Sequence, residues 1–222
     1  MTTRFLIPAV LLLLLSCARL PSIALKDDAF SSGVAVALDS LRIFPDGSWQ
    51  FLHSIQAEMP GGRNFLMMGL TVMSSRFQTH RSVIMTLEGF VVFDGEYDHR
   101  IIVHRALPPF DSPHFAEGLM DDIRLIFLEP DGPVVASGLL ENGFAVRRRQ
   151  TLDGGAVDIE ALPDGNWRIR RYSPSHQLVR TVTALHDEVD RYGFPKTIEL
   201  TASGGQAYRL IMTLLEAVCI EP

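Results

Sequence analysis

The chain has 222 residues, of which 47% are hydrophobic and 21% are charged. These proportions are typical of a globular protein with a substantial core and exclude a disordered chain. The formal charge of −6 at pH 7 argues against nucleic acid as a partner, because phosphate binding needs a basic excess. Stability must therefore come mainly from apolar burial, since the chain contains only two cysteines.

The first seventeen residues have the pattern of an export signal. Arg4 is followed by an apolar run from Phe5 to Leu15, which is shorter than the roughly 20 residues that cross a bilayer. The small residues Ser16 and Cys17 come next, and this order is typical of a secretory signal. The four residues 14–17, Leu-Leu-Ser-Cys, resemble the lipobox of bacterial lipoproteins, in which the cysteine is lipidated and becomes the first residue. The alternative is an ordinary signal peptide with an incidental cysteine.

The lipobox interpretation divides the chain into three parts. Residues 1–16 are a signal peptide, residues 17–46 a lipidated tether and N-terminal segment, and residues 47–222 the folded domain. Without residues 1–16 the formal charge becomes −7. A lipidated Cys17 leaves Cys219 without a disulfide partner, so we expect Cys219 to be a small buried hydrophobic residue.

Strands dominate the first half of the domain. A short helix at 32–41 and a Pro-Asp-Gly turn at 45–47 precede the first of them. Apolar runs and alternations predict strands at 49–55, 65–73, 83–93 and 97–103. The second strand is apolar on both faces and must be covered on both sides. Asp94-Gly95 is a strong hairpin signal.

One helix is predicted after Leu107-Pro108-Pro109. Asp111 or Ser112 can cap it, and Pro113 fits its first turn. Its apolar face comprises Phe115, Leu119, Ile123, Ile126 and Phe127. The opposite face carries Glu117, Asp121, Asp122 and Arg124.

Strands resume after the helix. A bend or short helix is expected at 134–140, and a polar loop at 186–190. Further strands are predicted at 144–149, 157–162, 167–172, 178–185, 195–201 and 208–218. Nine or ten sequential antiparallel strands and one principal helix predict an α+β fold that is mainly β. It is a strongly curved antiparallel sheet with a helix against one face.

No motif indicates catalysis. His186-Asp187-Glu188 lacks the second histidine of a zinc site, and no nucleophile elbow or phosphate loop occurs. We therefore expect no enzyme activity, cofactor or metal. The arginines at 147–149, 168, 170 and 171 are interpreted as solvent-facing strand residues that protect sheet edges. Contact with anionic lipid headgroups is the alternative.

Methionines gather on two neighbouring strands. Met67, Met68, Met73 and Met85 lie beside several aliphatic residues, and methionine adapts its shape to variable apolar ligands. The alternative is an ordinary core. Phe65 and Met67 fall on one face of their strand, Met68 and Leu70 on the other.

Several short segments together resemble the LolA/LolB-like fold, and more closely the LolB-like bacterial outer-membrane lipoproteins. They are Leu87-Glu88-Gly89 with Asp94-Gly95, Leu107-Pro108-Pro109, residues 119–125 with Pro130, residues 195–200 and Tyr208-Arg209-Leu210. The resemblance spans about 47–216. It implies an unclosed β-barrel covered by a helix, with an apolar cavity that accepts acyl chains. The ligand-binding residues expected on this basis are Phe65, Met67, Met85, Leu87, Leu119, Ile123 and Phe127.

The expected function is the binding or transfer, without catalysis, of lipid or acylated lipoprotein cargo. The alternatives are an envelope hydrolase acting on lipid or cell-wall material, and a purely structural lipoprotein. Ala18 follows the cysteine in place of an inner-membrane-retaining aspartate, so the resemblance implies the periplasmic face of a Gram-negative outer membrane. The expected partners are the membrane, acyl chains and an inner-membrane or periplasmic carrier, and we expect a monomer.

Overall fold

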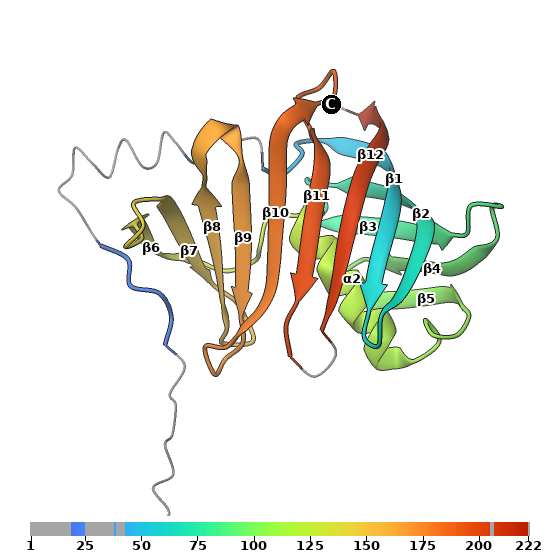
Figure 1. Ribbon diagram of the computed structural model, residues 1–222, viewed down its shortest axis with the longest axis horizontal. Coiled ribbons are helices and arrows are strands. Elements are labelled where there is room, and N and C mark those ends of the chain that lie inside the picture. The colour runs from blue at the N-terminus through green and yellow to red at the C-terminus, as the bar shows by residue number, and fades with distance from the viewer. Residues whose placement is uncertain (1–18, 25–37, 39–42, 205–206, 222) are drawn as a thin grey trace, which may run out of the picture.

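The computed structural model describes residues 19–24, 38, 43–204 and 207–221. Its strands form one 12-stranded antiparallel sheet in the order β5-β4-β3-β2-β1-β12-β11-β10-β9-β8-β7-β6 (Figure 1). The first five strands are β1 (Ser48–Met59), β2 (Arg63–Ser74), β3 (Thr79–Met85), β4 (Val91–Tyr97) and β5 (Ile101–Ala106). The other seven are β6 (Val134–Leu139), β7 (Ala145–Gln150), β8 (Ala156–Ala161), β9 (Trp167–Tyr172), β10 (Leu178–Val189), β11 (Pro195–Ala202) and β12 (Tyr208–Glu221). A short 3₁₀ turn, η1 (Pro163–Gly165), joins β8 to β9.

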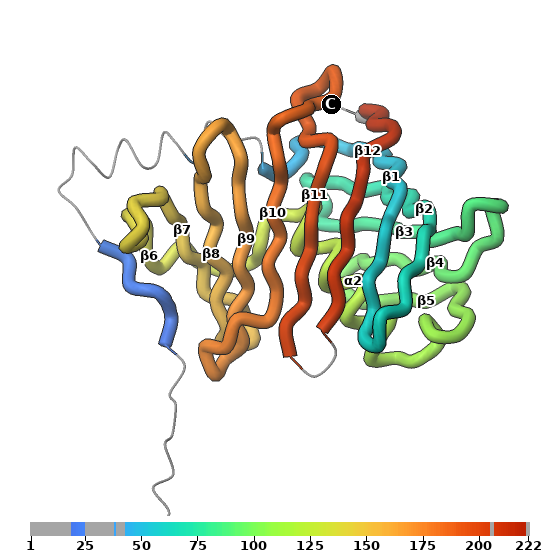
Figure 2. The backbone as a smooth tube through the Cα atoms, in the orientation of Figure 1, coloured from blue at the N-terminus to red at the C-terminus, as the bar shows by residue number. Residues whose placement is uncertain are grey.

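The sheet consists of two meanders that meet where β1 pairs with β12. Helix α2 (Pro113–Phe127) connects the two edge strands, β5 and β6. In Figure 2 the strands from β10 to β1 run upright while β3 to β5 run across the view, which displays the strong curvature of the sheet. The predicted fold class, a curved antiparallel sheet with a helix against one face, is confirmed.

The residues before and within the first turn of α2 explain where the helix begins. The Ser112 hydroxyl accepts a hydrogen bond from the Phe115 amide at 3.3 Å, and Pro113 occupies the first turn. Ser112 is therefore the cap among the two predicted candidates. One prediction for the helix was wrong: Asp122 lies on its buried side, not on its exposed one.

The core lies between α2 and the concave face of the sheet. Phe51, His53 and Ile55 alternate along β1 and are all buried there. The Phe51 ring stacks on Phe127 of the helix with centroids 5.2 Å apart. Trp167 and Ile169 of β9 belong to the same buried cluster, so both meanders contribute to one core.

One turn prediction and one strand prediction in the first meander were wrong. Asp94-Gly95 lies inside β4 beside a β-bulge, and the hairpin turn comes later, at residues 98–100. Register explains this, since Gly95 pairs with Ser82 of β3. The predicted run 83–93 is two strands, because the amide of Thr86 bonds to the carbonyl of Phe90 and closes a turn between them.

The second meander also departs from prediction. Val134–Leu139 is strand β6, not a helix or bend, and β10 continues to Val189 through the residues expected to form a polar loop. The described residues thus form twelve strands instead of nine or ten. Cys219 is half-buried.

Some predictions fall on residues that the structure does not describe. Cys17, the signal peptide and most of the helix expected at 32–41 lie outside the described residues, although Leu38 is described and buried. No helix in the described part of the chain is both long and apolar enough to cross a membrane.

Candidate functional site

The structure brings five of the seven predicted ligand-binding residues to the concave side. Phe65 and Met67 of β2 pair with Ala57 and Ile55, whose side chains are buried there. The helix contributes the other three, Leu119, Ile123 and Phe127. Ile123 and Phe127 are buried in the core, whereas Leu119 and Met67 are half-buried at its margin and Phe65 is exposed.

The other two predicted residues lie elsewhere. Met85 pairs with Met68 of β2, and both belong to the convex face. Leu87 lies in the turn between β3 and β4 and is exposed. The methionine cluster is therefore divided between the two faces of the sheet, because the side chains of successive residues in a strand point to opposite faces.

Apolar residues at the open margin of the core form a surface that we call the apolar rim. They are the exposed Phe65 and the half-buried Met67 of β2, Phe115 and Leu119 of α2, and Leu210 of β12. These residues belong to both layers of the fold, the sheet and helix α2. Deeper in the core, a cavity of about 20 Å³ is lined by Phe51, His53 and Phe127 among others. That volume suits a single water molecule rather than a ligand.

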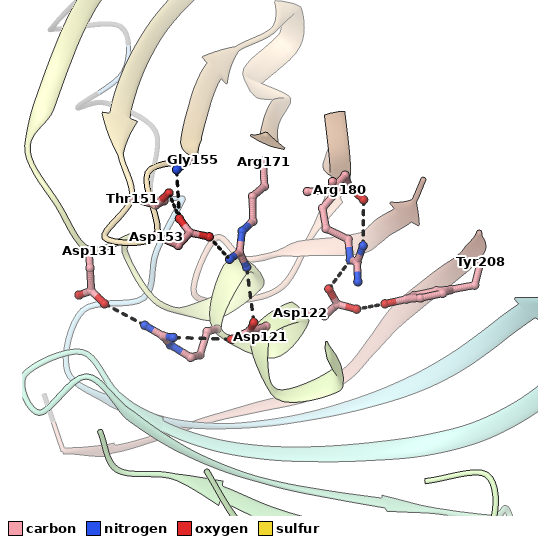
Figure 3. Close-up of polar contacts among 11 residues, drawn as sticks. Asp121, Asp122, Asp131, Thr151, Asp153, Gly155, Arg171, Arg180 and Tyr208 are labelled. Atoms are coloured by element: carbon pink, nitrogen blue, oxygen red, sulfur yellow. Dashed lines mark hydrogen bonds and ion pairs between the residues drawn. The ribbon is translucent and has the colours of Figure 1, made fainter. Parts of the chain in front are cut away.

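A buried polar cluster attaches the helix to the sheet. Arg180 of β10 donates from Nε to Oδ1 of Asp122 at 2.7 Å, and the Tyr208 hydroxyl of β12 donates to the other carboxylate oxygen. Figure 3 shows Asp122 pointing from the helix toward both partners. The Arg180 guanidinium also lies over the Tyr208 ring, 5.4 Å from its centroid.

Burial governs the ionisation of this cluster. Loss of solvation raises the pKa of Asp122, while the charge of Arg180 and the hydrogen bond from Tyr208 oppose that rise. Loss of solvation also raises the pKa of Tyr208, and the neighbouring Asp122 carboxylate raises it further. Tyr208 therefore remains a hydrogen-bond donor at neutral pH, as the contact with Asp122 requires.

A second pocket, of about 420 Å³, lies at the C-terminal end of α2. Its lining includes Tyr97, Arg124 and Leu152, together with four carboxylates. Asp121 lies 3.7 Å from both Arg124 and Arg171, and Asp131 and Asp153 pair with these two arginines in turn. Figure 3 shows Asp121 pointing toward Arg171. Two arginines and four carboxylates line the pocket, so it is charged and does not provide an apolar cavity.

Ion pairing also accounts for the arginine clusters. Arg148 is buried and pairs with the fully buried Asp158 at 2.6 Å, and Arg168 and Arg170 share the fully buried Glu160. Arg149 pairs with Glu129. The solvent-facing interpretation is wrong for Arg148, because Asp158 on the adjacent strand binds its guanidinium and both side chains are buried.

Among the described residues, no group of three or more histidine, cysteine or acidic side chains could hold a metal ion. The sequence did contain a signal for the Asp122 cluster that was not recognised. Asp122 lies three residues after Leu119 and four before Ile126, so helical spacing puts it beside the apolar face, and an acid at such a position needs a buried partner. Its partners could not be identified, because they lie 58 and 86 residues away.

A curved, unclosed antiparallel sheet with a helix on its concave face is the LolA/LolB-like fold, and the resemblance expected from the sequence is confirmed at the level of the fold. A LolA superfamily protein from Nitrosomonas europaea matches with a TM-score of 0.52 and 11% identity, covering 85% of this chain and 92% of that one.

Two further solved structures have slightly lower similarity. A DUF1329 family protein from Desulfovibrio piger has a TM-score of 0.48 at 10% identity, over 86% of this chain and 92% of that one. A domain described as an outer membrane lipoprotein-sorting protein domain, from Vibrio parahaemolyticus, also has a TM-score of 0.48 at 10% identity, over 84% and 90%. No protein-family model and no curated protein matches the chain.

Proposed function

We propose that this chain is a lipid-anchored protein of the outer membrane that binds acyl chains of lipid or lipoprotein cargo without catalysis. The observation that carries the proposal is the apolar concave face of an unclosed sheet, covered by one helix and margined by the apolar rim. The LolA/LolB-like fold supports the same function.

Acyl binding in this fold requires the helix to move. The cavity of about 20 Å³ beside Phe127 is too small for an acyl chain. The rim residues Met67, Leu119 and Leu210 pack against the core, so we expect a chain to enter there as α2 separates from the sheet. Phe65 and Met67 then form one wall and Leu119 the other. The Asp122 cluster lies on the same helix and resists this separation.

Substitutions at Leu119 and Ile123 should affect acyl binding and stability differently. Leu119→Glu at the half-buried rim should leave a folded protein and abolish binding, because an acyl chain would meet an unpaired charge. Ile123→Ala at the buried position should cost about 2–5 kcal/mol of unfolding free energy through lost burial. Thermal unfolding and the binding of a fluorescent fatty acid check both effects. Both are measured on soluble protein that comprises residues 18–222.

The same soluble protein distinguishes the three candidate functions, which are carrier, hydrolase and structural lipoprotein. Co-purified acyl species in native mass spectrometry support a carrier. Turnover of a lipid or cell-wall substrate would instead indicate a hydrolase. A clean protein mass with no fatty-acid binding would contradict the carrier and favour a structural lipoprotein.

The anchor and its location have their own test. Cys17→Ala should prevent acylation and release or misprocess the protein, whereas the wild-type chain should sediment with outer-membrane markers on a density gradient. Recovery of the wild-type protein with inner-membrane markers would count against the proposed location.

A further inference from the structure

The N-terminal segment at residues 19–24 is part of the folded domain. Ala24 exchanges two backbone hydrogen bonds with Leu139 of edge strand β6, at 2.8 and 3.2 Å. The Pro21 carbonyl accepts a hydrogen bond from Nη2 of Arg148 at 3.0 Å. Gly138 permits this close approach, because a Cβ at that position would lie 2.3 Å from the Ala24 carbonyl oxygen. These contacts hold the segment against β6 and β7.

The contacts also give the segment a direction. Leu139 pairs with Ala145 at the start of β7, whereas Arg148 lies three residues further on, toward the β7–β8 turn. The bridge between Ala24 and Leu139 is antiparallel, but the Pro21 carbonyl contacts Arg148, so the chain read backward from Ala24 crosses from β6 to β7 toward that turn. In Figure 1 the blue segment descends beside the sheet toward its lower edge, in agreement with this direction.

Exposed apolar side chains gather at the same end of the sheet. Leu152, at the tip of the β7–β8 turn, is 87% exposed. The start of β6 adds Val134 and Val135, and the start of β10 adds Leu178, all of them exposed. Val134 pairs with Arg149, and Leu178 with Tyr172, so both lie level with the ends of β7 and β9. We call these four residues the tether edge.

Hydrogen bonds fix the turn that carries Leu152. The Thr151 amide bonds to the Gly155 carbonyl at 3.1 Å, and the Gly155 amide bonds to the Asp153 carboxylate at 3.1 Å. Leu152 is thus presented to solvent by a hydrogen-bonded turn. Together with Val134, Val135 and Leu178 it forms a group of exposed apolar side chains, and such groups indicate an apolar interaction site.

We infer that the tether edge rests on the lipid bilayer, with Leu152 inserted at the interface. This inference depends on the proposed acylation of Cys17. Two residues of chain span at most about 7 Å, so acyl chains on Cys17 must enter the membrane close to Arg19. Because the segment from Pro21 is bound to the domain, the anchor fixes an orientation. A long flexible linker would instead let the domain take any orientation on the membrane. The 420 Å³ pocket, which Leu152 also lines, then lies at the level of the headgroups.

Depth-dependent fluorescence quenching tests the orientation. Full-length acylated protein is reconstituted in vesicles of phosphatidylethanolamine and phosphatidylglycerol, with Cys219→Ser removing the other thiol. An environment-sensitive fluorophore on Leu152→Cys should shift to the blue and be quenched by doxyl-labelled lipid. Glu141→Cys is the matched control, since Glu141 is exposed in the β6–β7 turn at the other end of the same strands, and its label should do neither.

A lengthened tether provides the second variant. Inserting about 20 Gly and Ser residues after Ala18 should preserve acylation and lower the quenching at Leu152→Cys, because such a linker spans about 25 Å. Acylated protein whose Leu152→Cys label is unquenched would overturn the orientation and leave the anchor intact. Equal quenching at Glu141→Cys would also overturn it. Protein recovered without an acyl mass on Cys17 would overturn the anchor and this inference together.

Discussion

Replacing Asp122 with asparagine is expected to lower the free energy of unfolding by about 3–5 kcal/mol, because breaking a buried ion pair leaves its partner without compensation. Arg180 would lose the carboxylate at 2.7 Å, and the Tyr208 hydroxyl would lose its charged acceptor. For a domain of this size, a loss of this magnitude corresponds to a fall of about 10 °C in melting temperature. Thermal unfolding measures it directly.

Asp121→Asn provides the matched control, since the two acids are adjacent on one helix. The Asp121 side chain is 40% exposed and lies 3.7 Å from its two arginine partners, so its loss should cost about 0–1 kcal/mol. The double variant Asp122→Leu/Arg180→Met should recover most of the lost stability, because both members of the pair are then removed. Equal destabilisation by Asp121→Asn and Asp122→Asn would contradict the special role of the buried pair.

The same variant connects stability with the proposed function. If separation of α2 from the sheet limits entry of an acyl chain, Asp122→Asn should bind a fluorescent fatty acid faster than the wild-type protein does. Unchanged association rates, with stability reduced as expected, would indicate that chains enter without movement of the helix near Asp122.

The second large effect concerns pH. Burial lowers the pKa of His53 on β1 to about 4, and burial together with the charge of Arg124 lowers the pKa of His80 on β3 to about 4. Histidine in an unfolded chain titrates near pH 6.5, so between about pH 6.5 and 4 the unfolded state binds more protons than the folded state. Stability must therefore fall as pH decreases through this range, by about 3 kcal/mol for each histidine.

Comparison of variants isolates this effect. Urea unfolding at pH 7 and pH 4.5 should show a loss of stability about 2–3 kcal/mol smaller in His53→Phe than in the wild-type protein. Burial raises the pKa of Asp122 and so acts in the opposite sense, which is why the two proteins are compared at each pH. His114→Phe, at an exposed position on the helix, should change nothing. Parallel pH profiles for the wild type and His53→Phe would contradict the prediction.

Local chemistry was sufficient to predict much of the fold. The strand predicted from Trp167 to Tyr172, after the turn at 163–166, is β9 with its observed bounds, and Ser112 with Pro113 predicted the start of α2. These signals lie within a few residues of the structure that they specify. Apolar periodicity likewise placed Leu119, Ile123 and Phe127 on the face that meets the sheet.

Local chemistry failed where pairing with a distant strand decided the outcome. Asp94-Gly95 has the composition of a hairpin turn, but β3 pairs with β4 beyond it, as far as His80 with Tyr97. Residues 134–139 have a weak local preference, and pairing with β7 makes them an edge strand. The methionines appeared to form one cluster, and the register divided them between two faces.

Alternating strands, a capped helix and a signal-like N-terminus can be predicted from the sequence, because each depends on neighbours in the chain. The pairing of β1 with β12, the contacts of Asp122 with Arg180 and Tyr208, and the position of residues 19–24 along β6 are seen only in the folded chain. Such contacts join segments that are far apart in the chain. They form where the curvature of the whole sheet brings two surfaces together, and no short stretch of sequence encodes that curvature.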